Sequence, residues 1–238
     1  MIHFITYGSN EYKITRKTLL AQAKTCPWFD SVKGYGEEDL CPEFKKKFSE
    51  ILSSARGGGY WCWKPHIIKR RMSEINDGDF LVYLDAGCRI NQEGKKRFYE
   101  YIKMIDESEY GVMSFQMIHP EKCWTTKEIF DYFNIERDSD FGNSGQYVAT
   151  AVIFKKNEHG KKIINEWEKS LIEKPLLWTN DYNHNQIECF KENRHDQSFL
   201  SLIRKINGSV VINSDETWTP TFGEGESMEF PFWAQRIK

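Results

Sequence analysis

The stretch DGDFLVYLDAGCRI, residues 77–90, decides the fold. Its centre, residues 80–84, is an uninterrupted apolar run of strand-forming residues, which predicts a strand buried on both faces of a sheet. The chain then leaves the core through Asp85, which two small residues follow. Ligands of open α/β sheets bind beyond the carboxyl ends of the strands, so this position predicts a functional acid. An ordinary turn or helix-capping role for Asp85 is the alternative.

Strand-like and helix-like segments alternate along most of the chain. Apolar residues spaced three and four apart, as at Ile164, Trp167 and Leu171, indicate helices with one buried face. The alternation predicts the α/β class: a single Rossmann-like domain over residues 1–238, with a mostly parallel central sheet and helices on both faces. The predicted strands are 2–7, 80–84, 112–115, 147–154 and 210–212, and the predicted helices are 16–24, 43–53, 65–75, 92–105, a segment around 164–171, and 196–206.

Composition and charge exclude several classes of protein. With 39% hydrophobic and 15% aromatic residues, the 238-residue chain can bury a sizeable core. The 33 Lys and Arg residues against 35 Asp and Glu give a net charge of -2, which offers no general attraction to nucleic acid. No apolar run is long enough to span a membrane, and the first residues, MIHFITYGSN, lack a basic leader. We therefore expect a soluble, cytoplasmic protein without a transmembrane segment.

The six cysteines are scattered, and no two of them form a C-x-x-C pair. This spacing is typical neither of a zinc ribbon nor of a dense disulfide framework. Reduced, buried or half-buried thiols are therefore predicted. The six are Cys26, Cys41, Cys62, Cys88, Cys123 and Cys189.

The run GGGYWCWKPHIIKRRM, residues 57–72, precedes the strand at 80–84. Its three glycines permit backbone conformations that other residues avoid, and they allow a ligand to approach closely. Lys64 stands directly before a predicted helix, where its charge and the free N–H groups of the helix can meet the same phosphate. No P-loop motif is present. The alternative is a core helix whose basic residues at 69–71 are merely solvated.

Three stretches together resemble one family: GYWCWKPHII (59–68), GDFLVYLDAGC (78–88) and RHDQSFLSLI (194–203). They are similar to small GT-A-fold glycosyltransferases of polysaccharide and glycan biosynthesis in bacteria and large DNA viruses. The resemblance implies a GT-A-like domain, a nucleotide-sugar donor and a hydroxyl of a glycan acceptor. A UDP-sugar is the favoured donor, with GDP- and dTDP-sugars as alternatives. The resemblance also implies a divalent metal, Mn²⁺ or Mg²⁺.

The resemblance also assigns roles to residues of this sequence. The Asp-x-Asp segment of the family corresponds to Asp85, Ala86 and Gly87, so its first acid is kept and its second is glycine. Asp85 is therefore expected to bind the metal alone, or through water, or to serve the ribose. The other implied donor-site residues are Tyr7 and Gly8 at the base and ribose, Lys64 at the diphosphate or sugar, Gln146 in the donor-sugar and acceptor pocket, His195 as a metal ligand or diphosphate donor, and Gln197. An exposed loop position is the alternative for Gln146.

Asp196 corresponds to the acid that the family places near the reacting carbon. If the enzyme inverts the anomeric centre, a carboxylate must deprotonate the acceptor hydroxyl, and Asp196 is the first candidate for that base. If it retains the configuration, Asp196 or Gln197 stabilises the transition state or binds substrate. Asp181 is the second candidate acid. Asp196 also begins a predicted helix, and a helix-capping role is the alternative.

Other functions remain open at this point. The missing second acid also fits a non-catalytic nucleotide-sugar or glycan-binding protein of the same fold. A nucleic-acid-binding reading of residues 60–71 conflicts with the net charge of -2. No spacing defines the carboxylate pair of a glycoside hydrolase. The aromatic tail, residues 217–238, is interpreted either as a lid over the bound donor or as a segment packed against the sheet edge or a second copy.

Overall fold

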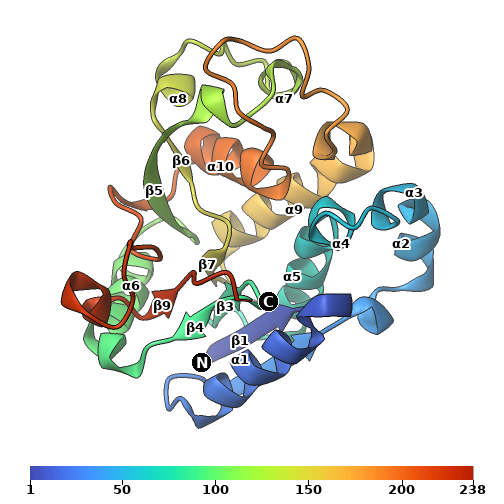
Figure 1. Cartoon of the computed structure of the whole chain (residues 1–238). Helices are drawn as coiled ribbons and strands as arrows, with labels where there is room; N and C mark the ends of the chain where they lie inside the picture. The colour runs from blue at the N-terminus through green and yellow to red at the C-terminus, as the bar shows by residue number, and fades with distance from the viewer. Residues whose placement is uncertain (238) are drawn as a thin grey trace.

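The computed structural model describes residues 1–237 and has a four-stranded sheet at its centre (Figure 1). The strands are ordered β2 (Ser31–Tyr35), β1 (Ile2–Tyr7), β3 (Phe80–Leu84) and β7 (Ala151–Lys155). The first three are parallel, whereas β7 runs antiparallel to β3. The predicted α/β class with a mostly parallel central sheet is confirmed.

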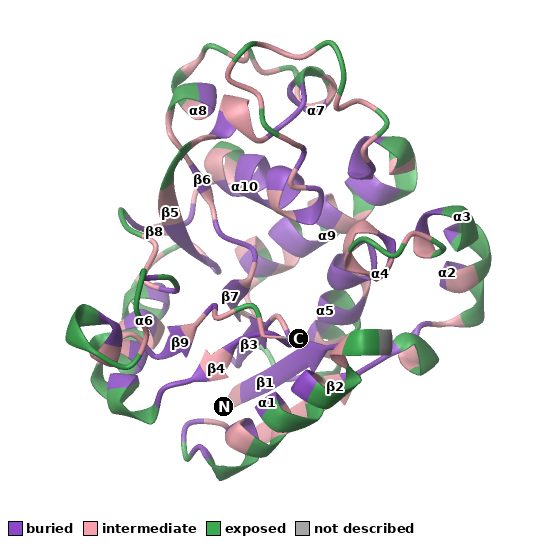
Figure 2. Ribbon diagram, in the orientation of Figure 1, coloured by how far each residue is buried: buried purple, intermediate pink, exposed green. Residues whose placement is uncertain are grey.

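Helices cover both faces of this sheet. Along β3, Leu81 and Tyr83 point into one hydrophobic core, and Phe80, Val82 and Leu84 point into another. The long helices are α1 (Lys13–Thr25), α5 (Trp63–Glu74), α6 (Lys95–Asp106), α9 (Glu158–Glu173) and α10 (Asp196–Asn207). The first core also contains residues of α5, α9 and α10, and the second contains residues of α1 and α6, so the strand is buried on both faces as its apolar run predicts (Figure 2).

Shorter helices connect these elements. The short α-helices are α2 (Pro42–Lys47), α3 (Ser49–Leu52), α4 (Gly57–Tyr60), α7 (Lys127–Tyr132) and α8 (Asp140–Asn143). The 3₁₀ helices are η1 (Asn10–Tyr12), η2 (Glu37–Asp39), η3 (Gln92–Gly94), η4 (Glu121–Cys123), η5 (Pro175–Trp178) and η6 (Gly225–Glu229). The helix predicted at 43–53 is thus divided between α2 and α3 at Phe48.

A strand missed by the sequence analysis is β2. Its Gly34 reads as part of a loop, but a Cβ atom there would lie 2.4 Å from Leu20 Cδ1 on α1. Glycine inside this strand therefore lets the Leu20 side chain pack directly against the sheet.

The prediction of one continuous strand over residues 147–154 is wrong. β6 (Gly145–Tyr147) pairs with β5 (Met113–Pro120) in a second sheet, which β8 (Val210–Ile212) completes, whereas β7 belongs to the central sheet. Between them the chain crosses from one sheet to the other, and side chains bind its backbone: Gln197 Oε1 accepts a hydrogen bond from Ala149 N at 3.0 Å. Only tertiary packing determines this break.

The tail packs along the edge of the molecule. β9 (Phe232–Trp233) pairs antiparallel with β4 (Arg89–Ile90), and Asn91 Nδ2 donates to the carbonyl oxygens of Met228 and Phe230 at 2.8 and 3.0 Å. These contacts hold the tail in a separate two-stranded sheet. Both interpretations of residues 217–238, as a lid and as a packed segment, stay predictions.

The prediction that all cysteines are reduced is wrong for one pair. Cys123 and Cys189 form a disulfide across 66 residues of sequence, while Cys26, Cys41, Cys62 and Cys88 are free. The fold places the two Cα atoms 5.2 Å apart, which the linear spacing could not indicate. Within residues 1–237, no helix is long and apolar enough to cross a membrane.

Candidate active site

The structure brings three predicted residues, Lys64, Asp85 and Asp196, together in one cluster. Lys64 Nζ lies 3.1 Å from Asp85 Oδ1 and 2.6 Å from Asp196 Oδ2. The lysine side chain is 2% exposed and the Asp196 side chain 5%, whereas Asp85 is 26% exposed and faces outward. A buried ammonium group thus bridges two carboxylates at the carboxyl end of β3. We call this group the Lys64 cluster.

Local structure explains how each member reaches the cluster. Asp85 follows the last residue of β3, and its backbone forms a turn in which Cys88 N donates to Asp85 O at 2.9 Å. Lys64 lies in the first turn of α5 and donates to Ala149 O at 3.3 Å, in the segment between the two sheets. Asp196 is the first residue of α10. Three segments distant in sequence therefore converge here.

Tyr83 is a site residue that the sequence analysis missed. Its hydroxyl donates to Asp85 Oδ1 at 2.6 Å, and its ring is fully buried. Side chains two residues apart in a strand lie on the same face, so the Tyr83–Asp85 spacing was the available signal. The tyrosine fixes one carboxylate oxygen of Asp85 and leaves the other free.

One cation serves two acids, and this sets the pKa values in the cluster. Burial raises the pKa of Asp196 to about 6; the charge of Lys64 lowers it, and the nearby Asp85 raises it. Burial by itself lowers the pKa of Lys64, but the charges of Asp196 and Asp85 outweigh it and leave that pKa raised. Asp196 is therefore a carboxylate whose basicity is shifted toward neutral pH.

A left-handed loop lies beside the cluster. Five consecutive residues have positive φ: Gly57 (59°), Gly58 (57°), Gly59 (97°), Tyr60 (52°) and Trp61 (57°). The sequence analysis predicted unusual backbone for the glycines, and this is confirmed. Two residues other than glycine in this region are strained, and such strain persists where surrounding structure enforces it.

His195 is held between this loop and the chain before α10. Its ring packs against those of Tyr60 and Trp61, with centroids 4.8 and 5.8 Å away. Arg56 Nε donates to His195 Nε2 at 2.9 Å, and His195 Nδ1 donates to Trp178 O at 2.9 Å, an assignment that follows from these partners. Burial, then the charge of Arg56, lowers the pKa of His195 to about 3. Both nitrogens are engaged, so the neutral ring positions Arg56 and offers no free nitrogen to a metal or diphosphate.

Gln146 and Gln197 form a chain of hydrogen bonds beneath the cluster. Gln197 Nε2 donates to Gln146 Oε1 at 2.7 Å, and Gln146 Nε2 donates to Glu121 Oε1 at 2.8 Å. Gln146 is fully buried, so the structure does not place it in an exposed loop or on an open pocket wall. Gln197 is half-buried and holds Ala149, whose carbonyl oxygen accepts from Lys64.

The ends of β1 and β3 lie side by side. A Cβ atom at Gly8 would lie 2.6 Å from Tyr12 O and 3.3 Å from Ala86 Cβ, so glycine is required there. Tyr7 is buried and stacks on Trp63 with centroids 3.7 Å apart, and burial raises its pKa to about 12. In this arrangement the Tyr7 ring packs on protein rather than facing an open base site.

The end of the tail covers Gly87. Ile237 N donates to Gly87 O at 3.2 Å, and a Cβ atom at Gly87 would lie 3.0 Å from Ile237 O and 3.1 Å from Arg236 Cα. Asp181, the second candidate acid, is exposed in the loop that follows η5. The tail, and not Asp181, is therefore the additional element at this edge of the sheet.

Solved structures with a similar arrangement are glycosyltransferases. A glycosyltransferase involved in the glycosylation of the major capsid of PBCV-1 aligns over 98% of this chain and 92% of its own, at a TM-score of 0.54 and 10% sequence identity. The bifunctional glycosyltransferase WbbM aligns over 91% of this chain, which matches only 39% of that protein, at a TM-score of 0.50 and 10% identity. No protein-family model matches the sequence, and no curated protein matches it.

The protein has a GT-A glycosyltransferase fold. At such low identity this likeness establishes architecture alone. In a GT-A fold the Lys64 cluster lies where the sequence analysis expects the donor, at the carboxyl ends of the strands. The individual roles of the site residues remain predictions.

The residues present at the GT-A site do not fit a metal held by the protein. Residues 1–237 contain no group of three or more His, Cys, Asp and Glu side chains placed to hold an ion. Asp85 Oδ1 is engaged by Tyr83 and Lys64, and the position of the second acid is Gly87. A buried lysine already supplies a positive charge between the two carboxylates. The Mn²⁺ or Mg²⁺ that the family resemblance implies stays a prediction.

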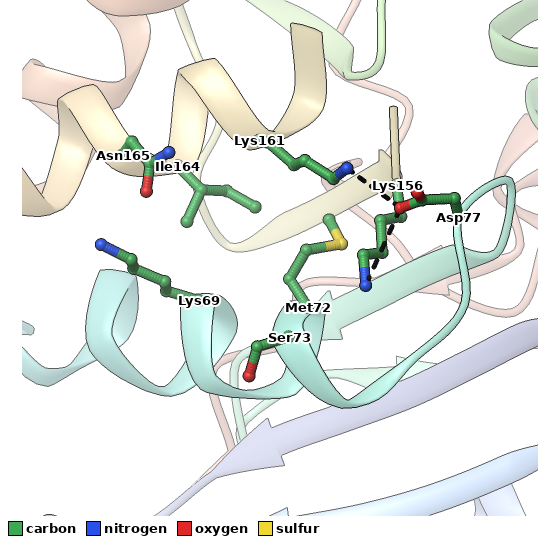
Figure 3. Close-up of a pocket in the computed structure, with 8 residues that line it drawn as sticks. All are labelled: Lys69, Met72, Ser73, Asp77, Lys156, Lys161, Ile164 and Asn165. Carbon is green, nitrogen blue, oxygen red and sulfur yellow. Dashed lines mark ion pairs between the residues drawn. The ribbon is translucent and has the colours of Figure 1, made fainter. Parts of the chain in front are cut away.

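Two hollows lie elsewhere on the surface. One of about 410 Å³ opens between α5 and α9, where Lys156 and Lys161 both pair with Asp77 (Figure 3). Another of about 710 Å³ lies between α7 and η5. Neither is lined by a residue of the Lys64 cluster. Asp77 in the first hollow is 74% exposed and pairs with Lys156 and Lys161, so the chemistry of the Lys64 cluster, rather than the size of a hollow, locates the candidate site.

Proposed function

We propose that this protein is a glycosyltransferase, which transfers a sugar from a nucleoside-diphosphate donor to a hydroxyl group of a glycan acceptor. The observation that carries the proposal is the buried Lys64 ammonium, which bridges Asp85 and Asp196 at the strand ends of a GT-A fold. A UDP-sugar is the favoured donor, and GDP- and dTDP-sugars are the alternatives. Perturbed ionisable groups at a strand end are typical of functional sites.

The reaction needs a proton acceptor and a stabilised leaving group. The acceptor oxygen bonds to the anomeric carbon, the bond from that carbon to the diphosphate oxygen breaks, and the nucleoside diphosphate leaves with the bonding electrons. In an inverting reaction the hydroxyl proton passes to a carboxylate. Asp196, with its pKa raised to about 6, suits that role near neutral pH. In a retaining reaction the hydroxyl proton would pass to the departing diphosphate oxygen, and Asp196 or Gln197 would stabilise the transition state.

The burial of Asp196 imposes a condition on this proposal. Its side chain is 5% exposed, so an acceptor can reach it only if the site opens on the side of Asp85. The tail end covers Gly87, two residues from Asp85, and is the segment whose displacement would open that side. On this ground we propose the lid role for the tail, residues 217–238, with its last part, residues 234–237, as the part that moves.

The same burial favours one second candidate, a non-catalytic nucleotide-sugar or glycan-binding protein. Turnover separates the two functions. A binder would show saturable affinity for a nucleotide and would release no sugar, whereas an enzyme would consume the donor.

Calorimetric titration with UDP, GDP, dTDP and CDP, each with and without manganese, tests the proposal. Wild-type protein is expected to bind one diphosphate, and Asp85→Ala is expected to lose that binding. Circular dichroism of both proteins shows whether the fold is intact. Asp181→Ala, which removes an exposed acid outside the cluster, is the control variant. The corresponding nucleotide sugar is then incubated with wild type, and released nucleoside diphosphate is measured. Failure of every diphosphate to bind folded wild-type protein would refute the proposed function.

A further inference from the structure

Two arginine side chains meet at Glu192, four residues before Asp196 in the chain. Arg56 Nη2 and Arg194 Nη1 both pair with Glu192, at 2.7 and 3.0 Å from its two carboxylate oxygens. Two guanidinium groups therefore share one carboxylate. Both remain about one third exposed, with 38% and 33% of their side chains accessible. Each guanidinium carries five N–H donors, more than these ion pairs use, so both can also donate to an anion.

The chain fixes both arginines close to Asp196. Arg194 lies two residues before it, and its guanidinium sits over the Trp124 ring, 4.3 Å from the centroid. Arg56 donates to the imidazole of His195, the residue that precedes Asp196. Because the ring of His195 is itself held by Trp178, the direction of Arg56 is set by buried structure rather than by solvent.

Arg236 approaches from the tail. Its Cα lies 3.1 Å from where a Cβ of Gly87 would be, which places this exposed residue beside the turn that follows Asp85. Within the described residues no ion pair holds its guanidinium, although its charge acts on the carboxyl of Asp215. Its φ of 55° is unusual for a residue other than glycine.

The charges of Arg236 and Arg56 both act on Arg194. Burial, together with the positive charges of Arg236 and Arg56, lowers the pKa of Arg194, while Glu192 raises it. Gathering like charges is unfavourable unless an anion joins them, and guanidinium groups bind phosphate oxygens in a two-pronged geometry. A divalent cation would add to the same repulsion.

We propose that Arg56, Arg194 and Arg236 hold the diphosphate of the donor in this chain, in place of a divalent metal. The proposal rests on the proposed function and goes beyond it, because it assigns the leaving-group charge to named side chains. Lys64 occupies the space between the two acids, Gly87 replaces the second acid, and the arginines supply the remaining positive charge. The expected ligand is a nucleoside diphosphate whose binding needs no metal.

Calorimetry of the full chain with UDP, GDP, dTDP and CDP tests this, each in EDTA and in MnCl₂. The dissociation constant in EDTA is expected to lie within about threefold of that in manganese, a difference well under one tenfold step of affinity. Arg194→Gln is expected to weaken binding about 10- to 100-fold, as the loss of a charge-assisted hydrogen bond does, and Arg194→Lys to weaken it less. Arg236→Gln is expected to act in the same direction. Lys96→Gln, at a side chain that is 93% exposed, is the charge-matched control.

The possible failures are distinct. Binding that requires manganese would overturn the inference and leave the proposed function standing. Binding in EDTA that the arginine variants do not weaken would also overturn it, provided that circular dichroism shows them folded. If no diphosphate binds in either buffer, the inference and the proposed function fall together. Metal-independent binding that weakens in Arg194→Gln and is unchanged in Lys96→Gln supports it.

Discussion

Two buried charged clusters of this protein differ in how fully their acids are satisfied. In the first, Lys64 is shared by Asp85 and Asp196. In the second, Glu121 pairs with Lys205 at 3.1 Å, and both side chains are at most 2% exposed. The two are linked, because Gln146 contacts Glu121 and Gln197, and Gln197 holds the segment that accepts from Lys64.

Glu121 is surrounded by donors. Thr125 Oγ1 donates to it at 2.6 Å and Gln146 Nε2 at 2.8 Å, and the Ser201 hydroxyl binds its second oxygen. In the Lys64 cluster, by contrast, two acids share one ammonium group, which lies 2.6 Å from Asp196 Oδ2 and 3.1 Å from Asp85 Oδ1. A buried acid that shares its cation keeps a raised pKa, as Asp196 does, and perturbed acids of this kind are typical of functional sites.

The largest expected effect is on catalysis. Asp196→Asn keeps the shape of the side chain but removes the proton acceptor, so sugar transfer should fall about 100- to 10,000-fold. Donor turnover by wild type and variant gives the measurement. Asp181→Asn, in an exposed acid, should change the rate less than about twofold, as surface substitutions usually do. Equal losses in both variants would contradict the assignment.

The second cluster should show the opposite pattern. Glu121→Gln leaves Lys205 buried without its charge partner, which should cost about 3–5 kcal/mol of unfolding free energy. Urea unfolding measures this loss. Diphosphate binding by the folded variant should stay near that of wild type. A stable variant that has lost binding would show that Glu121 belongs to the site.

The pH dependence of activity sharpens the comparison. Burial raises the pKa of Asp196 to about 6, and a base must be ionised, so kcat/KM should fall about tenfold per pH unit below that value. The residual activity of Asp196→Asn should not show this fall at low pH. The contribution of Asp196 to folding stability has the opposite pH dependence. Between the unfolded value of 3.8 and about 6 the native state binds more protons, so this group's contribution falls as pH rises through that window.

The smallest expected effect concerns the tail. In Gly87→Ala the new Cβ would lie 3.0 Å from Ile237 O, so the tail end must shift, at a cost of about 1 kcal/mol or less. Trypsin should then cleave after Arg236 faster than in wild type, as mass spectrometry can follow. Bound nucleoside diphosphate should change the cleavage rate of wild type if residues 234–237 are a lid. If wild type, wild type with bound nucleoside diphosphate and Gly87→Ala are all cleaved at the same rate, the tail only packs against the protein and is not a lid.

Much of the fold could be predicted because its signals are local. The apolar run at 80–84 and the helical spacing of Ile164, Trp167 and Leu171 depend on neighbours in sequence, and both elements are found. The strand β2 was missed because Gly34 resembles a loop residue in the sequence, whereas in the fold it packs against α1. Residues 147–154 were predicted as one strand because the hydrogen bond that holds the break comes from Gln197, which is distant in sequence.

The sequence by itself determined the α/β architecture and placed Asp85, Lys64 and Asp196 at element ends, since turn, strand and helix signals act over a few residues. Only the tertiary structure decided that one buried lysine bridges both acids, that Tyr83 holds Asp85, and that Cys123 meets Cys189. It also decided that His195 is fully engaged and that the tail reaches Gly87. These facts depend on distances between segments far apart in the chain, which packing sets and linear spacing does not encode.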